Sequence, residues 1–213
     1  MEILRVTDLK KYYGSGPNLT KALDGVSLSI RQGEFAAVVG SSGSGKSTLL
    51  NMMGGLDTPT EGSVIVGGKE LSCMKDEQLT IFRRRNIGFV FQNYNFIPIL
   101  NVRDNIVMPV GLDGGKADSG YLDSIVEMLG LTDKLNSLPG NLSGGQQQRV
   151  AIARALISKP AIVLADEPTG SLDRQNAKLV IDILKILNHY GKTIVLVTHD
   201  EELKRVGDRV IEL

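Results

Sequence analysis

The sequence predicts an α/β fold in which a mostly parallel β-sheet lies between helices, and two observations support this. Short β-favouring runs alternate with helical stretches along most of the 213 residues, a pattern typical of strand–helix–strand units. Several of the runs, such as Phe35–Val39 and Thr193–Val197, are apolar throughout. Strands of this kind are usually covered on both faces, as in a parallel sheet packed between helices.

The individual elements follow from these patterns. Strands are expected at Ile3–Thr7, Val26–Ile30, Phe35–Val39, Val64–Val66, Ile87–Phe91, Ile162–Ala165, Thr193–Val197 and Arg209–Leu213. Helices are expected at Lys46–Met53, Asp76–Arg85, Tyr121–Leu129, Gly144–Ser158, Gln175–Tyr190 and Glu201–Val206. The run Arg83–Arg85 is expected to be a solvated helix face rather than an anion site.

A helical insertion interrupts the α/β pattern. Between Gln92 and Ser143 no strand-forming run occurs, and Pro98, Pro109 and Pro139 divide the segment into helices and turns. We therefore expect one domain over 1–213, with a core formed by 1–91 and 159–213 and a helical subdomain at 92–158. Within it, the stretch 111–120 is rich in glycine and aspartate, which predicts a mobile surface loop.

The composition of the chain argues against a nucleic-acid partner and against a membrane-spanning segment. The 24 lysines and arginines balance 24 aspartates and glutamates, so no overall basic field favours a nucleic-acid partner. The apolar runs are far shorter than the roughly 18 to 20 residues that cross a bilayer, and the first residues resemble no leader. The only cysteine, Cys73, suits a reducing compartment. We expect a cytoplasmic protein.

A glycine-rich loop follows the apolar run Phe35–Val39 and precedes a helix, which is the context that the phosphate-loop pattern G-x-x-x-x-G-K-[ST] requires. Its glycines let successive N–H groups point at phosphate oxygens, and the helix presents its positive end to the same anion. Lys46 is expected to reach the β- and γ-phosphates, and the Ser47 hydroxyl to bind Mg²⁺. The predicted nucleotide-binding residues are Gly40, Ser41, Ser42, Gly43, Ser44, Gly45, Lys46, Ser47 and Thr48.

Two acids end the apolar run Ile162–Ala165, and Pro168 prevents the strand from continuing as a central ladder. Asp166 is suited to hold Mg²⁺, directly or through water, as sites of phosphoryl transfer require. Glu167 would polarise the attacking water as a general base. The pair is therefore the predicted catalytic centre.

Leu142-Ser143-Gly144-Gly145-Gln146, with the helical run after it, resembles the signature of ATP-binding cassette (ABC) ATPases. Ser143 is a good N-cap, and the glycines leave the first N–H groups of the helix open to an anion. The resemblance extends along the chain to Gln92 in the Q-loop position, Ser171-Leu172-Asp173 in the D-loop position and His199 in the switch-histidine position. It implies a phosphate-loop NTPase core with an antiparallel β portion near the N-terminus.

The same resemblance implies how the site works. Ser143, Gly144, Gly145 and Gln146 would cap the γ-phosphate of ATP bound by a second copy or a homologous ATPase, giving two composite sites per dimer. Gln92 would touch Mg²⁺ or water and transmit the nucleotide state, and His199 would contact the γ-phosphate as a catalytic residue. Tyr13 matches the aromatic residue that stacks on adenine, although the adjacent Tyr12 is an alternative because strand alternation puts only one of them on the nucleotide side.

Within the family, the chain most resembles the macrolide-export and lipoprotein-release subfamily, whose members drive a separate membrane permease. The chain would then lie on the inner face of the membrane, and the apolar patch Asn93–Leu100 either takes the coupling helix of that permease or forms the insertion's own core. An alternative is an ATPase whose membrane partner moves no substrate but activates a cell-wall hydrolase. Soluble ATPases of chromosomes or ribosomes are disfavoured, because the former need long coiled coils and the latter usually carry two cassettes.

Overall fold

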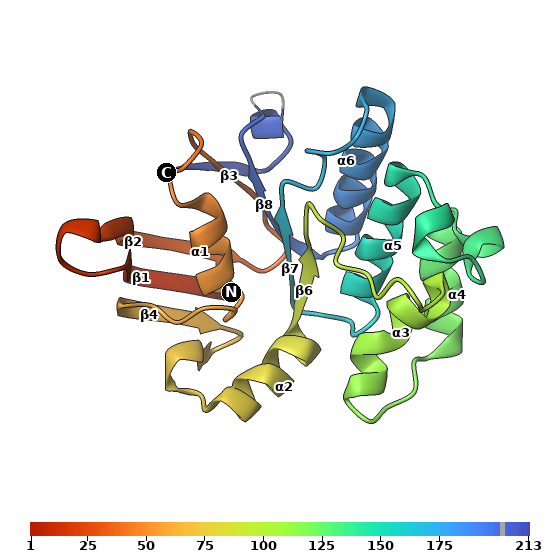
Figure 1. Ribbon diagram of the computed structural model, residues 1–213, viewed down its shortest axis with the longest axis horizontal. Helices are drawn as coiled ribbons and strands as arrows, with labels where there is room; N and C mark the ends of the chain where they lie inside the picture. Colours follow the sequence, from red (N-terminus) through yellow and green to blue (C-terminus); the bar gives the residue numbers. More distant parts are fainter. Residues whose placement is uncertain (201–202) are drawn as a thin grey trace.

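The computed structural model describes residues 1–200 and 203–213, which form two sheets with helices packed around them (Figure 1). In this described part, a five-stranded parallel sheet has the order β6-β7-β8-β3-β9. Its strands are β3 (Phe35–Val39), β6 (Ile87–Val90), β7 (Ile162–Asp166), β8 (Thr193–Thr198) and β9 (Arg209–Glu212). A four-stranded antiparallel sheet has the order β2-β1-β4-β5, with β1 (Glu2–Tyr13), β2 (Thr20–Arg31), β4 (Glu61–Val66) and β5 (Lys69–Glu70). The predicted fold class is confirmed.

The helices are α1 (Lys46–Met53), α2 (Asp76–Asn86), α3 (Val102–Leu112), α4 (Ser119–Met128), α5 (Gly144–Leu156) and α6 (Arg174–His189). Short 3₁₀ turns lie at Gly16–Asn18, Leu71–Cys73, Thr132–Lys134, Pro139–Asn141 and Leu203–Arg205. The helix expected at Glu201–Val206 begins with two residues outside the described ones, and the turn Leu203–Arg205 takes part of its place. Among residues 1–200 and 203–213, no helix combines the length and apolar character needed to cross a membrane.

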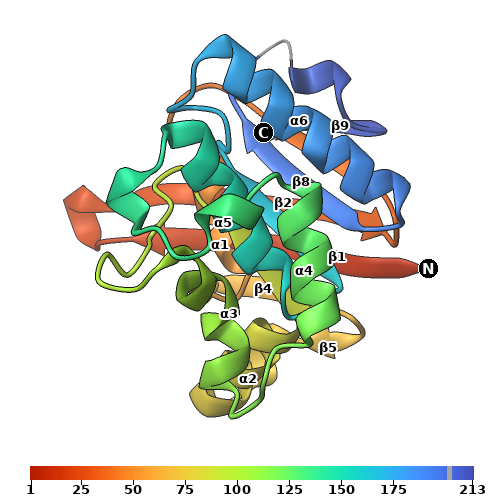
Figure 2. The same cartoon turned by 90° about the vertical axis from the view of Figure 1, so that its right-hand side faces the viewer.

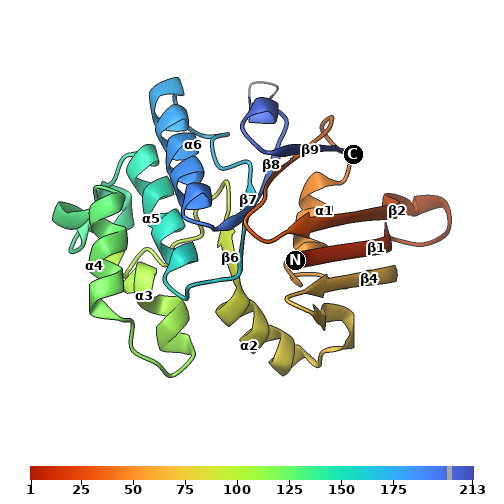
Figure 3. The same ribbon diagram turned by 180° about the vertical axis from the view of Figure 1, so that it is seen from behind.

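The parallel sheet is buried on both faces, which explains its apolar strands. Along β7, Ile162 and Leu164 pack toward α1 and the antiparallel sheet, whereas Val163 and Ala165 pack toward α5 and α6. Figure 1 and the reverse view in Figure 3 show α5 and α6 on one side of this sheet and α1 on the other. Figure 2, which faces the right-hand side of Figure 1, shows that α3, α4 and α5 form a helical layer there.

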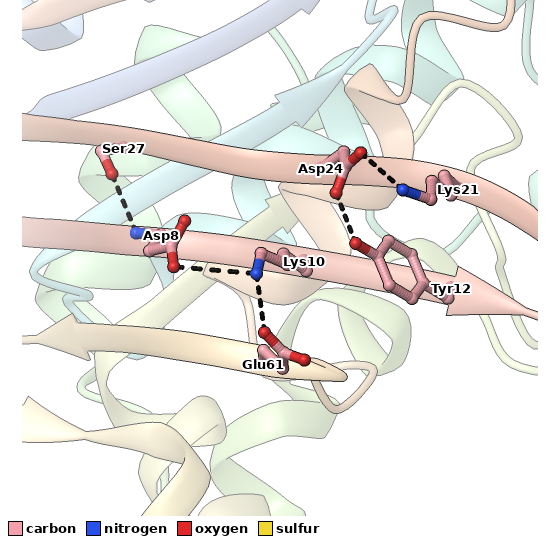
Figure 4. A network of polar contacts seen from close by, with 7 residues as sticks. All are labelled: Asp8, Lys10, Tyr12, Lys21, Asp24, Ser27 and Glu61. Carbon is pink, nitrogen blue, oxygen red and sulfur yellow. Dashed lines mark hydrogen bonds and ion pairs between the residues drawn. The ribbon is translucent and has the colours of Figure 1, made fainter.

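Strands β1 and β2 are each longer than the apolar pattern predicts. The extra residues include buried Leu9 and Leu23, but many are polar, and cross-strand contacts hold these on the open face of the antiparallel sheet (Figure 4). Lys10 Nζ lies 2.7 Å from Glu61 on β4, and the Tyr12 hydroxyl donates to Asp24 on β2. Charged pairs across a sheet stabilise it in a way that local hydropathy does not report, so sequence alone ended β1 too early and began β2 too late.

Helix α3 is an element that the sequence analysis did not place. Asn101 caps it by accepting a hydrogen bond from the N–H of Asp104 at 2.8 Å, and Pro109 lies inside its last turn. The buried Asn105 side chain donates to the carbonyls of Ile97, Leu100 and Asn101 and accepts from the N–H of Ile97. The side-chain amide of Asn105 thus fixes the irregular segment 97–101 before α3. The shape of this segment therefore depends on a residue that comes after it in the sequence.

The loop after α3 is shorter than the predicted stretch 111–120, because α3 continues to Leu112 and α4 begins at Ser119. Asp113, its first residue, pairs with Arg84 at 3.1 Å and with Arg85 at 2.7 Å. The side-chain hydrogen bond from Arg85, set against a smaller effect of burial, lowers the pKa of Asp113. These two arginines therefore bind a neighbouring loop instead of forming the purely solvated face that was expected, and the mobility of the loop stays a prediction.

Candidate functional site

The phosphate loop connects β3 to α1 and curls as the motif predicts. Gly43 and Gly45 adopt positive φ values of 80° and 94°, which side chains other than glycine rarely tolerate. A Cβ at Gly45 would lie 2.2 Å from the carbonyl oxygen of Ala22 on β2. The N–H of Ser44 donates to the carbonyl of Ser41 at 3.2 Å, closing the turn. The loop conformation therefore requires the glycines at these spacings.

Lys46, the first residue of α1, is buried although it is charged. Its Nζ donates to the carbonyls of Gly40 at 3.0 Å and Ser41 at 2.8 Å, so the ammonium lies against the loop that it follows. A cation held inside a ring of backbone groups is well placed to attract a polyanion to that loop.

Ser47 and Asp166 meet across the sheet edge. The Ser47 hydroxyl donates to Oδ1 of Asp166, at the end of β7, at 3.2 Å. Burial raises the pKa of Asp166, and the neighbouring charge of Glu167 adds to this effect, while Ser47 and Lys46 oppose it. Oxygen donors of this kind suit Mg²⁺. In the described residues no group of three His, Cys, Asp or Glu side chains gathers as a metal site.

The raised pKa of Asp166 makes a testable contribution to stability. Since the pKa is higher in the folded chain than in the unfolded one, the ionised carboxylate destabilises the fold above the folded pKa, and this cost vanishes as pH falls below the unfolded value of about 4. We expect Asp166→Asn to raise the melting temperature at pH 7 without nucleotide or Mg²⁺, and the gain to disappear near pH 4. Thermal denaturation at both pH values checks this, and a lower melting temperature at pH 7 would contradict it.

Glu167 and His199 lie together at the ends of β7 and β8. The Nδ1 atom of His199 is 2.6 Å from the Glu167 carboxylate. Glu167 has a positive φ of 46°, an uncommon conformation for a residue with a side chain, and its N–H donates to the carbonyl of Val197 at 2.9 Å. The sharp change of direction after the strand aims the carboxylate at the histidine.

Gln92 follows β6, which pairs with β7, so it emerges at the same sheet edge as the two acids. Its side chain is exposed, and its Nε2 would lie 2.9 Å from a Cβ built at Gly170, just beyond Glu167. Gln92 is therefore near the loop after the acid pair.

One cavity of about 470 Å³ brings several of these residues together. It is lined by Thr20, Lys21, Ala22, Ser42, Gly43, Gly45, Lys46, Ser47, Thr48, Glu167 and His199. The first three come from the start of β2 and were not predicted as site residues. No local motif marks them, because the β1–β2 hairpin carries them over the phosphate loop only in the folded chain.

The residues Ser143–Gln146 lie elsewhere. Ser143 and Gln146 form a reciprocal cap, in which Gln146 Oε1 accepts from the Ser143 N–H at 2.9 Å and Ser143 Oγ accepts from the Gln146 N–H at 3.3 Å. A Cβ at Gly145 would lie 2.1 Å from Oδ1 of Asn176 on α6. Helix α5 lies on the opposite side of the parallel sheet from α1 (Figure 1), and none of these four residues lines the 470 Å³ cavity.

Tyr12 and Tyr13 point to different surroundings at the end of β1. The Tyr12 hydroxyl donates to Asp24, and Lys21 lies over its ring (Figure 4). The Tyr13 hydroxyl donates to Asp57 in the loop after α1 at 2.9 Å. Tyr13 is thus on the side of the strand that faces the phosphate-loop helix.

Comparison with known proteins agrees with this geometry. Residues 23–170, which include the phosphate loop, the Ser143–Gln146 cap and the acid pair, match the family model described as ABC transporter. The chain belongs to the ABC transporter family. ABC membership accounts for both the parallel core and the antiparallel sheet beside it.

Two kinds of ABC relatives are similar over the whole chain. The macrolide export ATP-binding/permease protein MacB of Neisseria meningitidis serogroup B is 44% identical over 215 residues, covering 100% of this chain and 33% of MacB. The chain thus spans about a third of the length of the MacB proteins it matches. The uncharacterized ABC transporter ATP-binding protein MJ1508 of Methanocaldococcus jannaschii is 45% identical over 215 residues, covering 99% of this chain and 95% of the relative.

Solved ABC structures share the fold closely. The dimeric structure of MJ0796, a bacterial ABC transporter cassette, has a TM-score of 0.90 and 44% identity, covering 99% of this chain and 94% of the other. A dimeric structure of MJ0796 in a post-hydrolysis state, bound to ADP and Pi, has a TM-score of 0.89, 43% identity and the same coverage.

Proposed function

We propose that the chain is the ATP-binding and ATP-hydrolysing subunit of an ABC transporter, which dimerises around two ATP molecules and drives a separate membrane permease. The observation that carries the proposal is the single cavity in which the phosphate loop, Lys46, Glu167 and His199 meet. Family membership gives this cavity its context, since MJ0796 has been captured with ADP and Pi.

The phosphate end of the cavity is the first part of the proposed site. Backbone N–H groups of 40–48 and the Lys46 ammonium would bind the phosphates, because both are donors directed at one anion. Ser47 and Asp166, with Gln92 nearby, would hold Mg²⁺ through oxygen atoms. Bound there, the ion would neutralise phosphate charge and polarise the bond to be cleaved.

Glu167 and His199 form the catalytic part. The Glu167 carboxylate would accept a proton from the attacking water, while a His199 that donates from Nδ1 holds that carboxylate in its orientation. The hydrogen bond at 2.6 Å supports this pairing. His199 would also contact the γ-phosphate, which requires its ring to stay on the cavity side of β8.

The composite site requires a second cassette. In one chain the Ser143–Gln146 cap lies across the sheet from α1 (Figure 1), so its open N–H groups cannot serve the same chain's phosphate loop. We propose that they bind the γ-phosphate held by another copy or a homologous ATPase. A two-fold pair closes both sites at once, and the dimers of MJ0796 support this arrangement.

We propose Tyr13, rather than Tyr12, as the residue that stacks on adenine. Burial is the main cause that raises the pKa of Tyr13, and the hydrogen bond to Asp57 raises it further. A hydrogen bond with the Thr48 side chain lowers this pKa by a smaller amount. Thr48 itself lines the cavity. Tyr12, by contrast, is engaged by Asp24 and Lys21.

We further propose that 1–213 is one domain, with a core of 1–91 and 159–213 and a helical subdomain at 92–158, and that the permease docks where these parts meet. An open groove of about 450 Å³ lies there, and its lining combines apolar residues with three arginines; they include Phe89, Phe91, Met108, Leu112, Arg83, Arg84 and Arg154. Phe96 in the patch Asn93–Leu100 packs on the helical core, whereas Ile99 is 83% exposed. We therefore propose both roles for the patch, with Phe96 in the core of the insertion and Ile99 available to the permease.

The chain would then lie in the cytoplasm on the inner face of the membrane, held there by its permease. Export or extraction of a peptide, lipid, lipoprotein or antibiotic is the favoured task because of the similarity to MacB. A permease that instead regulates a cell-wall enzyme would use the same cassette. A nucleic-acid partner is not proposed, given the balance of 24 basic and 24 acidic residues.

Copurification from membranes tests the permease partner. We expect the tagged chain to retain an integral membrane protein, whose identity separates transport from mechanical signalling. Leu112→Glu places a charge on a 65% exposed groove residue and should abolish retention while leaving ATP binding unchanged. Leu179→Glu, on an exposed part of α6, is the matched control, and equal retention by both variants would argue against docking in the groove.

A further inference from the structure

The end of β1 is fastened to the loop that follows α1 by a compact polar cluster. Asp57 accepts hydrogen bonds from Lys11 Nζ at 2.7 Å, from the Tyr13 hydroxyl at 2.9 Å and from the Thr58 N–H at 2.7 Å. Lys11 Nζ also donates to the Thr58 carbonyl at 2.8 Å. Both oxygens of one carboxylate are therefore used to join two segments that are far apart in the sequence.

The same lysine also contacts the aromatic ring. Lys11 Nζ lies 4.9 Å from the centroid of Tyr13, within the range in which a cation is attracted to a ring face. The Lys11 side chain is only 13% exposed, so the ammonium is fixed there by Asp57 and Thr58. The ammonium lies over one face of the ring, and Tyr13 is still 42% exposed, so part of its surface is accessible to a ligand.

Asp57 carries the charge that holds this cluster together. Burial alone would raise the pKa of Asp57, but the hydrogen bonds from Lys11 and Tyr13 outweigh it, so the net pKa is lowered. The carboxylate is therefore ionised at neutral pH and remains a strong acceptor for both partners. An exposed tyrosine at a strand end would otherwise sample several rotamers.

We infer that Asp57 and Lys11 are positioning residues that hold the Tyr13 ring as a ready platform for the adenine base. The inference rests on the proposed function, in which adenine stacks on Tyr13. Because binding need not then order the ring, the base contributes more to affinity. We call Asp57, Lys11 and their contacts with Tyr13 the clamp. It also joins the base platform, Tyr13, to the phosphate-binding helix α1, since Asp57 lies in the loop that follows α1.

The test separates recognition of the base from recognition of the phosphates. Kd values of the full chain for ATP and for tripolyphosphate are measured by calorimetry in parent, Asp57→Asn, Lys11→Met and Tyr13→Phe. Each variant keeps an aromatic ring but loses part of the clamp. We expect each to weaken ATP binding about 3- to 10-fold and to leave tripolyphosphate binding unchanged.

Glu61→Gln is the matched control, because Glu61 pairs with the adjacent Lys10 at 2.7 Å on the same sheet (Figure 4) but contacts neither tyrosine. It should bind both ligands like the parent. Equal weakening of ATP and tripolyphosphate in the clamp variants would mean that Asp57 and Lys11 support only the loop structure, which overturns the inference. Parent-like ATP affinity in all three clamp variants also overturns it.

Tyr13→Ala distinguishes the inference from the function beneath it. If this variant binds ATP as tightly as the parent, Tyr13 is not the adenine platform, and both statements fail. If this variant binds ATP weakly, the role of Tyr13 as the adenine platform is supported. The role of Asp57 is then tested by combining the two substitutions. Asp57→Asn added to Tyr13→Ala should then cause no further loss, whereas an undiminished additional loss would show that Asp57 acts independently of the ring.

Discussion

Glu167→Gln is expected to slow ATP hydrolysis by about 10²- to 10⁴-fold, the usual contribution of a general base, while ATP binding is kept. The amide has nearly the shape of the carboxylate and can still bond to His199, but it cannot accept the proton of the attacking water. Unhydrolysed ATP should then hold two chains together, so size-exclusion chromatography with ATP and Mg²⁺ should show a stable dimer.

The control for this experiment is Glu127→Gln, which changes an exposed carboxylate on α4 and should hydrolyse ATP at the parent rate. Near-normal hydrolysis in Glu167→Gln would remove Glu167 as the base. A cassette measured without its permease can hydrolyse ATP slowly, so a slow parent rate alone decides nothing. The quantity of interest is the ratio of the hydrolysis rates of variant and parent.

Lys46→Ala is expected to raise the Kd for ATP by about 100-fold, equivalent to about 3 kcal/mol of charge-assisted hydrogen bonding. Lys46 is buried and fixed by the carbonyls of Gly40 and Ser41, so its removal takes away the ammonium that lies directly against the phosphate loop. Equilibrium binding of a fluorescent ATP analogue measures the effect.

Lys178→Ala, which removes an exposed lysine of α6, serves as the control and should bind ATP as the parent does. A melting temperature close to that of the parent would show that Lys46→Ala still folds. Tight ATP binding by a folded Lys46→Ala variant would contradict the phosphate-loop assignment.

The parts of the site that sequence predicted are those whose chemistry is local. The glycines of the phosphate loop, the cap formed by Ser143 and Gln146, and the acids at the end of β7 each depend on residues within a few positions of one another. Their conformations follow from backbone freedom, capping and strand termination. The α/β class was predictable for the same reason, because buried strands are apolar along their whole length.

What sequence could not predict depends on contacts between distant segments. Strand β1 extends through Lys10 because Glu61 and Asp24 lie across from it, and Thr20–Ala22 reach the cavity only through the hairpin. Helix α3 was missed because Pro109 suggested a break, whereas a proline in the last turn removes few hydrogen bonds. Our proposal of Tyr13 over Tyr12 depends on the position of Asp57, which no local pattern gives.

The position of β3 has a consequence for how the protein forms. Phe35 pairs with Ile194 and Ala36 with Arg209, so both neighbours of this strand come from residues much later in the sequence. Closing loops of that length is slow, and during synthesis these partners emerge well after β3. All four strands of the antiparallel sheet lie early in the sequence, so that sheet can form first. In the described part of the chain, strand β3 has no hydrogen-bonded partner strand until β8 and β9 have been made. We therefore expect the phosphate loop to be completed late in folding, and nucleotide binding to require that β8 and β9 have joined β3 in the sheet.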